Sequence, residues 1–243
     1  MPNYVYGKNA TREALLNNSI TELYLSTKQG FDEWINLAMK NHIKIVYVTA
    51  DQLNKMAATM KHQGIIGKKK EEYKYYSVED IINSKNDNFE TSLIVMLDCL
   101  EDPHNLGAVL RSADAFGVDG VIIPSHRSVK LNETVAKVST GAIEYVKVAE
   151  VTNLTKTVDY LKTKGYWIVG AEMCDRAIPF DTIDYNMNMV LIIGSEGKGI
   201  SRLLLEQCDY VSYIPMYGHV NSLNASLSCG IMLSEINKGR KKK

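Results

Sequence analysis

Few cysteines, few prolines and no surplus of either charge characterise this sequence of 243 residues. Its four cysteines form no Cys-x-x-Cys pair and have no histidine at ligand spacing, so neither a zinc site nor a disulfide framework is indicated. Five prolines, with 45% hydrophobic and 23% charged residues, exclude disordered and collagen-like chains and predict a globular protein. No apolar run approaches the roughly 18 residues of a membrane helix. Because residues 1–6 also lack the blocks of a signal peptide, we expect a cytoplasmic protein without membrane segment or metal.

The net charge of zero hides a difference between two parts of the chain. Residues 1–76 contain 11 Lys or Arg and 7 Asp or Glu, whereas residues 77–243 contain 17 and 21. A stretch between residues 61 and 76 combines Lys61, Lys68, Lys69 and Lys70 with three tyrosines. Such a stretch can bind a phosphate backbone and stack on bases, but it is also typical of a solvated strand end.

Two domains are predicted, separated by a polar segment. Residues 84–91 combine low hydrophobicity with turn formers and precede an apolar run, so we assign residues 77–91 to a linker. In residues 1–76, helical and strand-like patterns alternate, which favours a small α/β domain. Its helices are expected at 9–16, 31–39 and 51–60, and its strands at 22–25, 44–49 and 65–66.

Residues 92–243 alternate strand and helix more clearly. Strands are expected at 93–97, 121–123, 145–148, 167–171, 190–193 and 210–214. Helices are expected at 106–116, 133–140, 154–164, 201–207 and 223–237. This spacing predicts a mostly parallel sheet with helices on both faces. Because ligands of such sheets bind beyond the carboxyl ends of the strands, three segments at strand ends are expected to form one site.

The first of these segments follows the strand at 93–97 and opens a helix. Asn105 is expected to cap this helix, and Arg111 lies away from its apolar stripe. The planar guanidinium of Arg111 could bind a phosphate. An ion pair with Asp114 within the helix is an equal alternative.

The second segment follows the strand at 190–193 and is rich in glycine. Gly194, Gly197 and Gly199 allow close approach of the backbone to a ligand, and Glu196 lies among them. The spacing differs from a Walker A loop, from Gly-x-Gly-x-x-Gly and from a Gly-x-Ser-x-Gly nucleophile elbow. A surface turn that needs glycine for positive φ is the alternative interpretation.

The third segment follows the strand at 210–214 and precedes the last helix. Ile214, Pro215 and Met216 lead through a short loop to Ser222, Leu223 and Asn224. Ser222 is a candidate N-cap with Asn224 beside it, and the small side chains allow close packing against a ligand or a partner subunit. A well-packed helix start would use the same residues.

Together, Asn105-x5-Arg111, Gly194-x-Glu196-Gly197-x-Gly199, and Ile214-Pro215-Met216 with Ser222-Leu223-Asn224 resemble the three motifs of the SpoU family. This family comprises S-adenosylmethionine-dependent RNA ribose 2′-O-methyltransferases. The resemblance covers residues 93–238. Residues 1–76, with Gly7-Lys8-Asn9-Ala10 and His62-Gln63-Gly64, are similar to the ribosomal-protein-like RNA-binding domain of the 23S rRNA guanosine methyltransferase branch.

The resemblance implies a C-terminal trefoil knot, which ordinary connection rules would not predict, and a homodimer built across the knot region. It assigns S-adenosylmethionine binding to Gly194, Ile214 and Leu223. It places Arg111 at the substrate phosphate and the 2′-hydroxyl, where the family's proposal is that it assists deprotonation. Because arginine has a pKa above about 12, the base role is a hypothesis beside that of orienting the phosphate. The remaining catalytic set is Asn105, Glu196, Ser222 and Asn224, as groups that orient Arg111, substrate and cofactor loop.

The leading interpretation is methylation of a guanosine ribose in 23S rRNA. A tRNA substrate is the first alternative, although enzymes of the related tRNA branch generally lack the N-terminal domain. A non-catalytic RNA-binding ribosome-assembly factor is the second, and intact Arg111, Glu196 and Asn224 speak against it. A generic nucleotide-binding module is disfavoured because its phosphate-loop patterns are missing. The basic tail at 240–243 is either a solvated end or an RNA contact.

Overall fold

The computed structural model describes residues 4–242, so residues 1–3 and Lys243 of the basic tail lie outside the described part of the chain. Contacts within the chain define two compact units. The N-terminal unit comprises the described residues up to 74 together with residues 131–145, and the C-terminal unit comprises residues 75–130 and 146–242. Among the described residues, none of the helices is long and apolar enough to cross a membrane.

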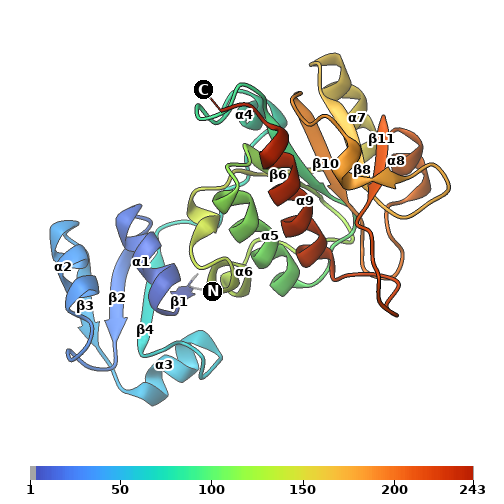
Figure 1. Ribbon diagram of the computed structural model, residues 1–243. Helices are drawn as coiled ribbons and strands as arrows, with labels where there is room; N and C mark the ends of the chain where they lie inside the picture. Colours follow the sequence, from blue (N-terminus) through green and yellow to red (C-terminus); the bar gives the residue numbers. More distant parts are fainter. Residues whose placement is uncertain (1–3, 243) are drawn as a thin grey trace. The chain divides into compact units, whose positions relative to one another are not determined.

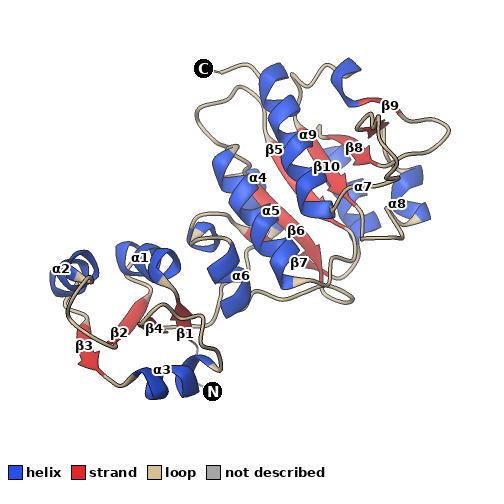
Figure 2. Ribbon diagram, turned by 60° about the horizontal axis from the view of Figure 1, so that its bottom comes forward, coloured by secondary structure: helices blue, strands red, loops and turns tan. Residues whose placement is uncertain are grey.

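The N-terminal unit is built on a four-stranded sheet with the order β1-β4-β2-β3 (Figure 1). Its strands are β1 (Tyr4–Tyr6), β2 (Ile20–Leu25), β3 (Lys44–Tyr47) and β4 (Ile65–Lys69). Only β2 and β3 run parallel; the pairs β1–β4 and β2–β4 are antiparallel. Helices α1 (Lys8–Leu16) and α2 (Asp32–Lys40) lie on one side of this sheet and α3 (Ala50–Ala57) on the other (Figure 2). The expected α/β architecture is therefore present, with β1 as an additional strand that the sequence reading missed.

Residues 131–145 complete the core of this unit although they lie far along the chain. They form α6 (Glu133–Val138) and a 3-10 turn (Ala142–Glu144). Ala136 is 1% exposed and packs in one cluster with Ala14 and Leu15 of α1. The Nζ atom of Lys69 lies 3.0 Å from Oε1 of Glu144, and both side chains are nearly buried. The N-terminal unit therefore includes a segment that the predicted domain boundaries assign to residues 92–243.

The C-terminal unit contains a seven-stranded parallel sheet with the order β7-β6-β5-β10-β8-β11-β9. The strands are β5 (Leu93–Leu97), β6 (Gly120–Pro124), β7 (Val148–Val151), β8 (Trp167–Ala171), β9 (Ile178–Pro179), β10 (Met189–Ile193) and β11 (Tyr210–Tyr213). Every residue of β5, β6 and β10 is buried, because both faces of the sheet are covered. This confirms the predicted parallel sheet.

Helices cover both faces of the C-terminal sheet, as predicted. On one face, Ile81 of α4 (Val78–Ile82), Val158 of α7 (Leu154–Thr163) and Leu204 of α8 (Arg202–Glu206) join one apolar cluster with the strands. On the other face, α5 (Pro103–Ala115) and α9 (Ala225–Gly239) pack side by side (Figures 1 and 2). The trefoil knot stays a prediction.

Two segments differ from their expected structure. The strand expected at 145–148 lies at Val148–Val151, because the left-handed Gly141 (φ 97°) leads into the 3-10 turn that includes Ile143 and Glu144. The segment 77–91, predicted as a linker, begins with α4, whose start is fixed by a capping box of Ser77 and Asp80. Further along, the buried Phe89 and the backbone of Glu90 pair with the C-terminal tail.

That tail is ordered at its first residue. The guanidinium of Arg240 lies 3.9 Å from the centroid of the Phe89 ring, and its Nη2 atom donates a hydrogen bond to the carbonyl of Thr91 at 2.7 Å. Arg240 is 3% exposed. Both interpretations of the tail were therefore wrong for Arg240, which packs against the segment that leads into β5 instead.

Candidate active site

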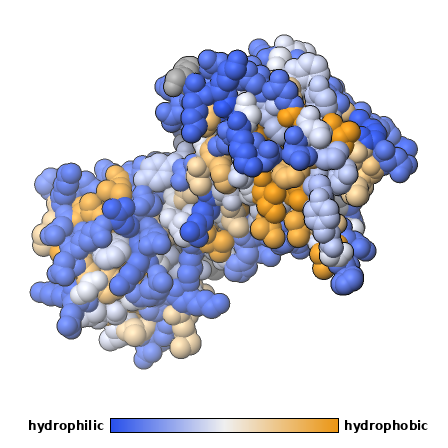
Figure 3. All heavy atoms as spheres, in the orientation of Figure 1, coloured by the Kyte–Doolittle hydropathy of each residue, from blue (hydrophilic) through white to orange (hydrophobic). Residues whose placement is uncertain are grey.

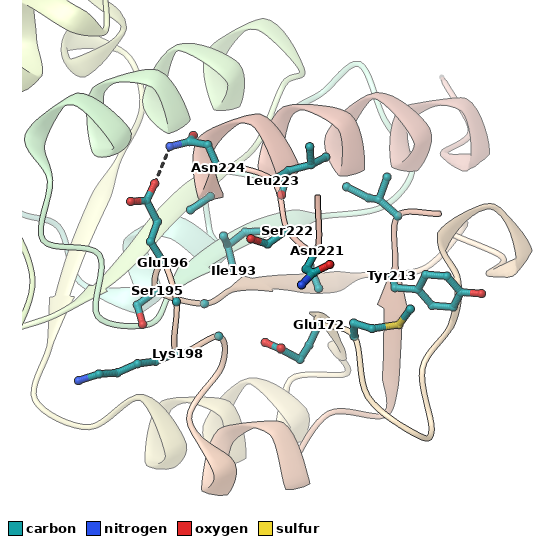
Figure 4. A pocket seen from close by; sticks show the side chains of 18 of the residues that line it. Glu172, Ile193, Ser195, Glu196, Lys198, Tyr213, Asn221, Ser222, Leu223 and Asn224 are labelled. Atoms are coloured by element: carbon teal, nitrogen blue, oxygen red, sulfur yellow. Dashed lines mark hydrogen bonds between the residues drawn. The ribbon is translucent and has the colours of Figure 1, made fainter. Parts of the chain in front are cut away.

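A cavity of about 580 Å³ opens at the carboxyl ends of β8, β10 and β11 (Figure 4). It is lined by residues 171–173 at the end of β8, 193–199 at the end of β10, 212–214 and Met216 at the end of β11, and 221–225 with Ser228 at the start of α9. This is the edge where parallel sheets bind ligands. The size lies within the range of about 300–1,000 Å³ typical of small-molecule sites.

The loop after β10 is a tight, closed turn. Ser195 and Gly199 exchange two backbone hydrogen bonds of 3.1 and 3.0 Å. A Cβ atom on Gly194 would lie 2.2 Å from the carbonyl carbon of Gly199, so no larger residue fits there. Gly199 itself has φ +65°, which favours glycine. The glycines thus allow the loop to close on itself beside the cavity.

Two carboxylates anchor the end of this loop from both sides. β10 lies between β5 and β8, and an acidic residue directly follows each neighbour: Asp98 after β5 and Glu172 after β8. Oε2 of Glu172 accepts a hydrogen bond from the backbone N–H of Ile200 at 2.8 Å. Oδ2 of Asp98 accepts one from Ser201 at 2.7 Å. Sequence reasoning missed both residues, although an acid at the end of a predicted strand is a usable signal.

The three sequence motifs meet in a triad of polar side chains. Nδ2 of Asn105 donates to Oε1 of Glu196 at 3.0 Å. Nδ2 of Asn224 donates to the same oxygen at 2.5 Å and to Oδ1 of Asn105 at 2.9 Å (Figure 4 shows the bond to Glu196). Each motif therefore contributes one side chain to the triad, and each of the three side chains is hydrogen-bonded to the other two.

The helix caps at this site differ from those expected. The N-cap of α5 is Asp102, which accepts a hydrogen bond from the N–H of His104 at 2.8 Å, with Pro103 in the first turn. Asn105 is therefore free to face Glu196. The N-cap of α9 is Asn224, not Ser222, because Oδ1 of Asn224 accepts from the N–H groups of Ser226 and Leu227.

Because Asn224 both caps α9 and bonds to Glu196, two substitutions should separate these roles. Asn224→Ala should lower the free energy of unfolding by about 1 kcal/mol and also reduce activity at this site. Asn224→Ser keeps a capping oxygen, so it should retain stability but lose activity like the alanine variant. Urea unfolding and a turnover assay measure the two effects.

The matched control is Asn153→Ala, which removes the cap of α7, where Oδ1 of Asn153 accepts from the N–H of Lys156 at 3.0 Å. It should reduce stability by a similar amount without changing turnover. Wild-type turnover in Asn224→Ser would show that the triad has no part in the activity.

The structure gathers most of the predicted site residues, but not all of them. Those that line the cavity are Gly194, Ile214 and Leu223 of the predicted cofactor set, with Glu196, Ser222 and Asn224. Asn105 does not line the cavity itself, but it is hydrogen-bonded to Glu196 and Asn224, which do. Arg111 is exposed on α5, six residues or about 9 Å along the helix from Asn105, and does not line the cavity.

Three thiols of the C-terminal unit lie in surroundings that disfavour the thiolate form. Burial raises the pKa of Cys208 and of Cys229 to about 12. Burial also raises the pKa of the Cys99 thiol, and a hydrogen bond with Asp98 adds to this. Within residues 4–242, no group of three or more His, Cys, Asp or Glu side chains is placed to hold a metal ion.

Comparison with known families assigns both parts of the chain. Residues 92–234 match the SpoU rRNA Methylase family, and residues 4–74 match the family described as RNA 2′-O ribose methyltransferase substrate binding. A protein of Staphylococcus haemolyticus, described as a TrmH family tRNA/rRNA methyltransferase, is 43% identical over 97% of this chain and 95% of its own length. YacO of Bacillus subtilis, with the same description, is 42% identical over 98% and 96%.

Solved structures share the fold. The AdoMet-bound rRNA methyltransferase of Sinorhizobium meliloti has a TM-score of 0.78 at 20% identity and covers 97% of this chain and 87% of that one. AviRb of Streptomyces viridochromogenes in complex with AdoMet has a TM-score of 0.78 at 20% identity, covering 97% and 89%. The A. aeolicus TrmH/SpoU tRNA modifying enzyme has a TM-score of 0.58 at 28% identity, covering 66% and 82%. With a family match over residues 92–234 and relatives above 40% identity along nearly its whole length, this chain belongs to the SpoU family of RNA methyltransferases.

Proposed function

We propose that this protein transfers a methyl group from S-adenosylmethionine to a ribose 2′-hydroxyl of RNA. The observation that carries the proposal is the Asn105–Glu196–Asn224 triad, which joins the three motifs at the edge of the cavity. The cavity fits a nucleoside cofactor, because it combines backbone groups of the 194–199 loop with the apolar side chains of Ile214, Met216 and Leu223.

The protein's own residues have two tasks in this reaction. The cofactor supplies an activated methyl group on a sulfonium, so the chain must position the ribose hydroxyl and help to remove its proton. In our proposal Arg111 binds the phosphate beside the reacting ribose, and its guanidinium orients the hydroxyl. Glu196 accepts two amide hydrogen bonds on one oxygen and so holds the 194–199 loop against α5 and α9. Ser222 borders the cavity next to Leu223.

The N-terminal unit is proposed to bind the RNA substrate through its exposed lysines. Lys61 and Lys70 are exposed, and the side chain of Lys68 is 42% exposed beside Glu22. Lys69 does not take part, because its side chain is 7% exposed, pairs with Glu144 and lies 3.7 Å from the centroid of the Tyr73 ring. Only part of the predicted basic stretch is thus available to a phosphate backbone.

For the substrate we propose a guanosine in 23S rRNA, with tRNA as the alternative. The two-unit architecture supports rRNA: the S. meliloti rRNA methyltransferase covers 97% of this chain, whereas the A. aeolicus tRNA modifying enzyme covers 66%. The relatives described as tRNA/rRNA methyltransferases are compatible with both. A non-catalytic assembly factor is disfavoured by the intact triad. Ribose and phosphate are common to all nucleotides, so the guanosine rests on the family branch alone.

We also propose that the protein acts as a cytoplasmic homodimer. Figure 3 shows hydrophobic side chains gathered on the face that carries α9, where Leu227 is 52% exposed. An exposed apolar surface of this kind supports contact with a second copy. A dimer built there would also bring a second chain close to the start of α9, where the cavity lies.

The test is transfer of labelled methyl from S-adenosylmethionine to unmodified 23S rRNA and, in parallel, to unmodified tRNA. Label recovered in a 2′-O-methylguanosine of 23S rRNA is the expected result. Label in tRNA would keep the reaction and change the substrate. Absence of cofactor binding would overturn the proposed reaction in favour of a non-catalytic RNA-binding protein.

A further inference from the structure

Glu172 is the acidic side chain of the cavity that the three motifs do not include. It directly follows β8, and its backbone N–H donates to the carbonyl of Ser212 on β11 at 3.0 Å. The side chain lines the cavity and is half-buried. Its position is therefore fixed by the sheet, and its carboxylate is fixed by the loop after β10.

The two carboxylate oxygens of Glu172 have different surroundings. Oε2 accepts the hydrogen bond from Ile200. Oε1 accepts no hydrogen bond within the described residues, although the whole carboxylate packs against Gly199, where a Cβ atom would lie 2.1 Å from Oε2 and 2.7 Å from Oε1. One oxygen thus holds the loop, while the other keeps its acceptor capacity at a ligand cavity.

Glu172 lies apart from the reacting end of the site. Figure 4 shows Glu196 and Asn224 on one side of the cavity and Glu172 on the other, with Asn221 and Ser222 between them. In the proposed reaction the substrate ribose would approach from the side of Arg111 and the triad, so the methyl group of a bound cofactor would face that side of the cavity. Glu172, on the opposite side, would then be available to the adenosine part of the same molecule.

We propose that Glu172 binds the ribose hydroxyls of the adenosine part of the cofactor through its free oxygen. A vicinal diol offers two hydrogen-bond donors, and an ionised carboxylate is an acceptor without a proton of its own. Hydrogen bonds to charged groups are stronger than neutral ones, so this contact discriminates between ribose and deoxyribose. The inference rests on the proposed function, since it assumes a cofactor with an adenosine part.

The test measures ligand binding by isothermal titration calorimetry on the full chain. The probes are S-adenosylhomocysteine, its 2′-deoxy and 3′-deoxy analogues, and S-adenosylmethionine. Wild-type protein should bind at least one deoxy analogue about tenfold more weakly than S-adenosylhomocysteine. In Glu172→Gln the amide oxygen can still accept from Ile200, but an NH₂ group replaces the free oxygen, cannot accept from the hydroxyls and can offer them only a neutral hydrogen bond. The discrimination should therefore fall below about twofold, without loss of the fold.

The matched control is Asp98→Asn, which alters the other carboxylate that anchors the same loop but does not line the cavity. It should weaken all the probes by the same factor and keep the discrimination of the wild type. An unchanged discrimination in Glu172→Gln would overturn the role of Glu172 while leaving the proposed function intact. Selective loss of S-adenosylmethionine over S-adenosylhomocysteine would also overturn it, because the carboxylate would then sense the sulfonium charge. Failure of the wild type to bind any probe would overturn the proposed function itself.

Discussion

Replacement of Arg111 by alanine is expected to reduce methyl transfer about a thousandfold while leaving the affinity for S-adenosylmethionine unchanged. Arg111 is exposed on α5 and does not line the cavity, so its loss removes nothing that holds the cofactor. It does remove the planar donor group proposed to hold the substrate phosphate. Single-turnover transfer to RNA and calorimetric titration of the cofactor measure the two quantities separately.

Arg111→Lys distinguishes the two proposed roles of this residue. Lysine keeps the positive charge but loses the planar pair of donors. If Arg111 orients the phosphate, the lysine variant should show a raised KM for RNA and a partly retained kcat; if it assists deprotonation, kcat should fall with KM unchanged. The control is Arg202→Ala on α8, whose side chain is 84% exposed beside Glu206. Turnover near that of the wild type in Arg111→Ala would remove Arg111 from the mechanism.

The hydrophobic pattern of the sequence predicted the strands, and the parallel strand order predicted which loops lie together at the site. Strands that are buried on both faces stand out as apolar runs, and β5 and β8 begin and end where the sequence indicated. Because the carboxyl ends of parallel strands share one edge, the motifs that follow β10 and β11 were expected together. Their hydrogen-bonded arrangement around Glu196 could not be predicted from the sequence, because contacts between residues 28 to 119 positions apart leave no local signal.

The predicted N-caps Asn105 and Ser222 were wrong, although the sequence near each helix start contains a signal for the observed cap. Asp102 precedes Pro103, and an acidic cap followed by proline in the first turn is a stronger start signal than Asn105. Moving the cap three residues back releases the amide of Asn105 for the triad. At α9, Asn224 caps the helix with its oxygen and donates to Glu196 with its nitrogen, so two separate atoms of one amide serve the helix and the triad.

The extent of the N-terminal unit could not be predicted from the sequence. A helix over residues 133–140 was expected, and α6 lies there. An apolar stripe shows that a helix packs on something but does not say on what, and the nearest strands in the chain, β6 and β7, belong to the other unit. Deletion of residues 1–76 would therefore expose Ala136, which is buried in the intact unit. A loss of RNA binding in that variant could result from lost stability as well as from lost RNA contacts.

Glu144→Leu is a sharper test of this unit and is expected to destabilise it by about 3–5 kcal/mol. Lys69 and Glu144 form a pair whose side chains are only 7% and 10% exposed. Without Glu144 the ammonium group of Lys69 keeps its contact with the Tyr73 ring but loses its counter-charge in a site that water hardly reaches. Urea unfolding and hydrogen exchange of the α1 and β4 amides measure the loss. RNA affinity should fall with it, and cofactor affinity should remain.

The double variant Lys69→Met, Glu144→Leu decides whether the charge or the packing causes this loss. Replacing both members of a buried pair by apolar side chains of similar size is often neutral, so stability should return to within about 1 kcal/mol of the wild type. Breaking the exposed pair of Arg202 and Glu206 with Glu206→Ala should cost less than about 1 kcal/mol and serves as the control. If Glu144→Leu were as mild as that control, residues 131–145 would not be anchored to β4. Recovery of RNA binding in the double variant would show that Lys69 acts through the fold of the unit and not by touching RNA.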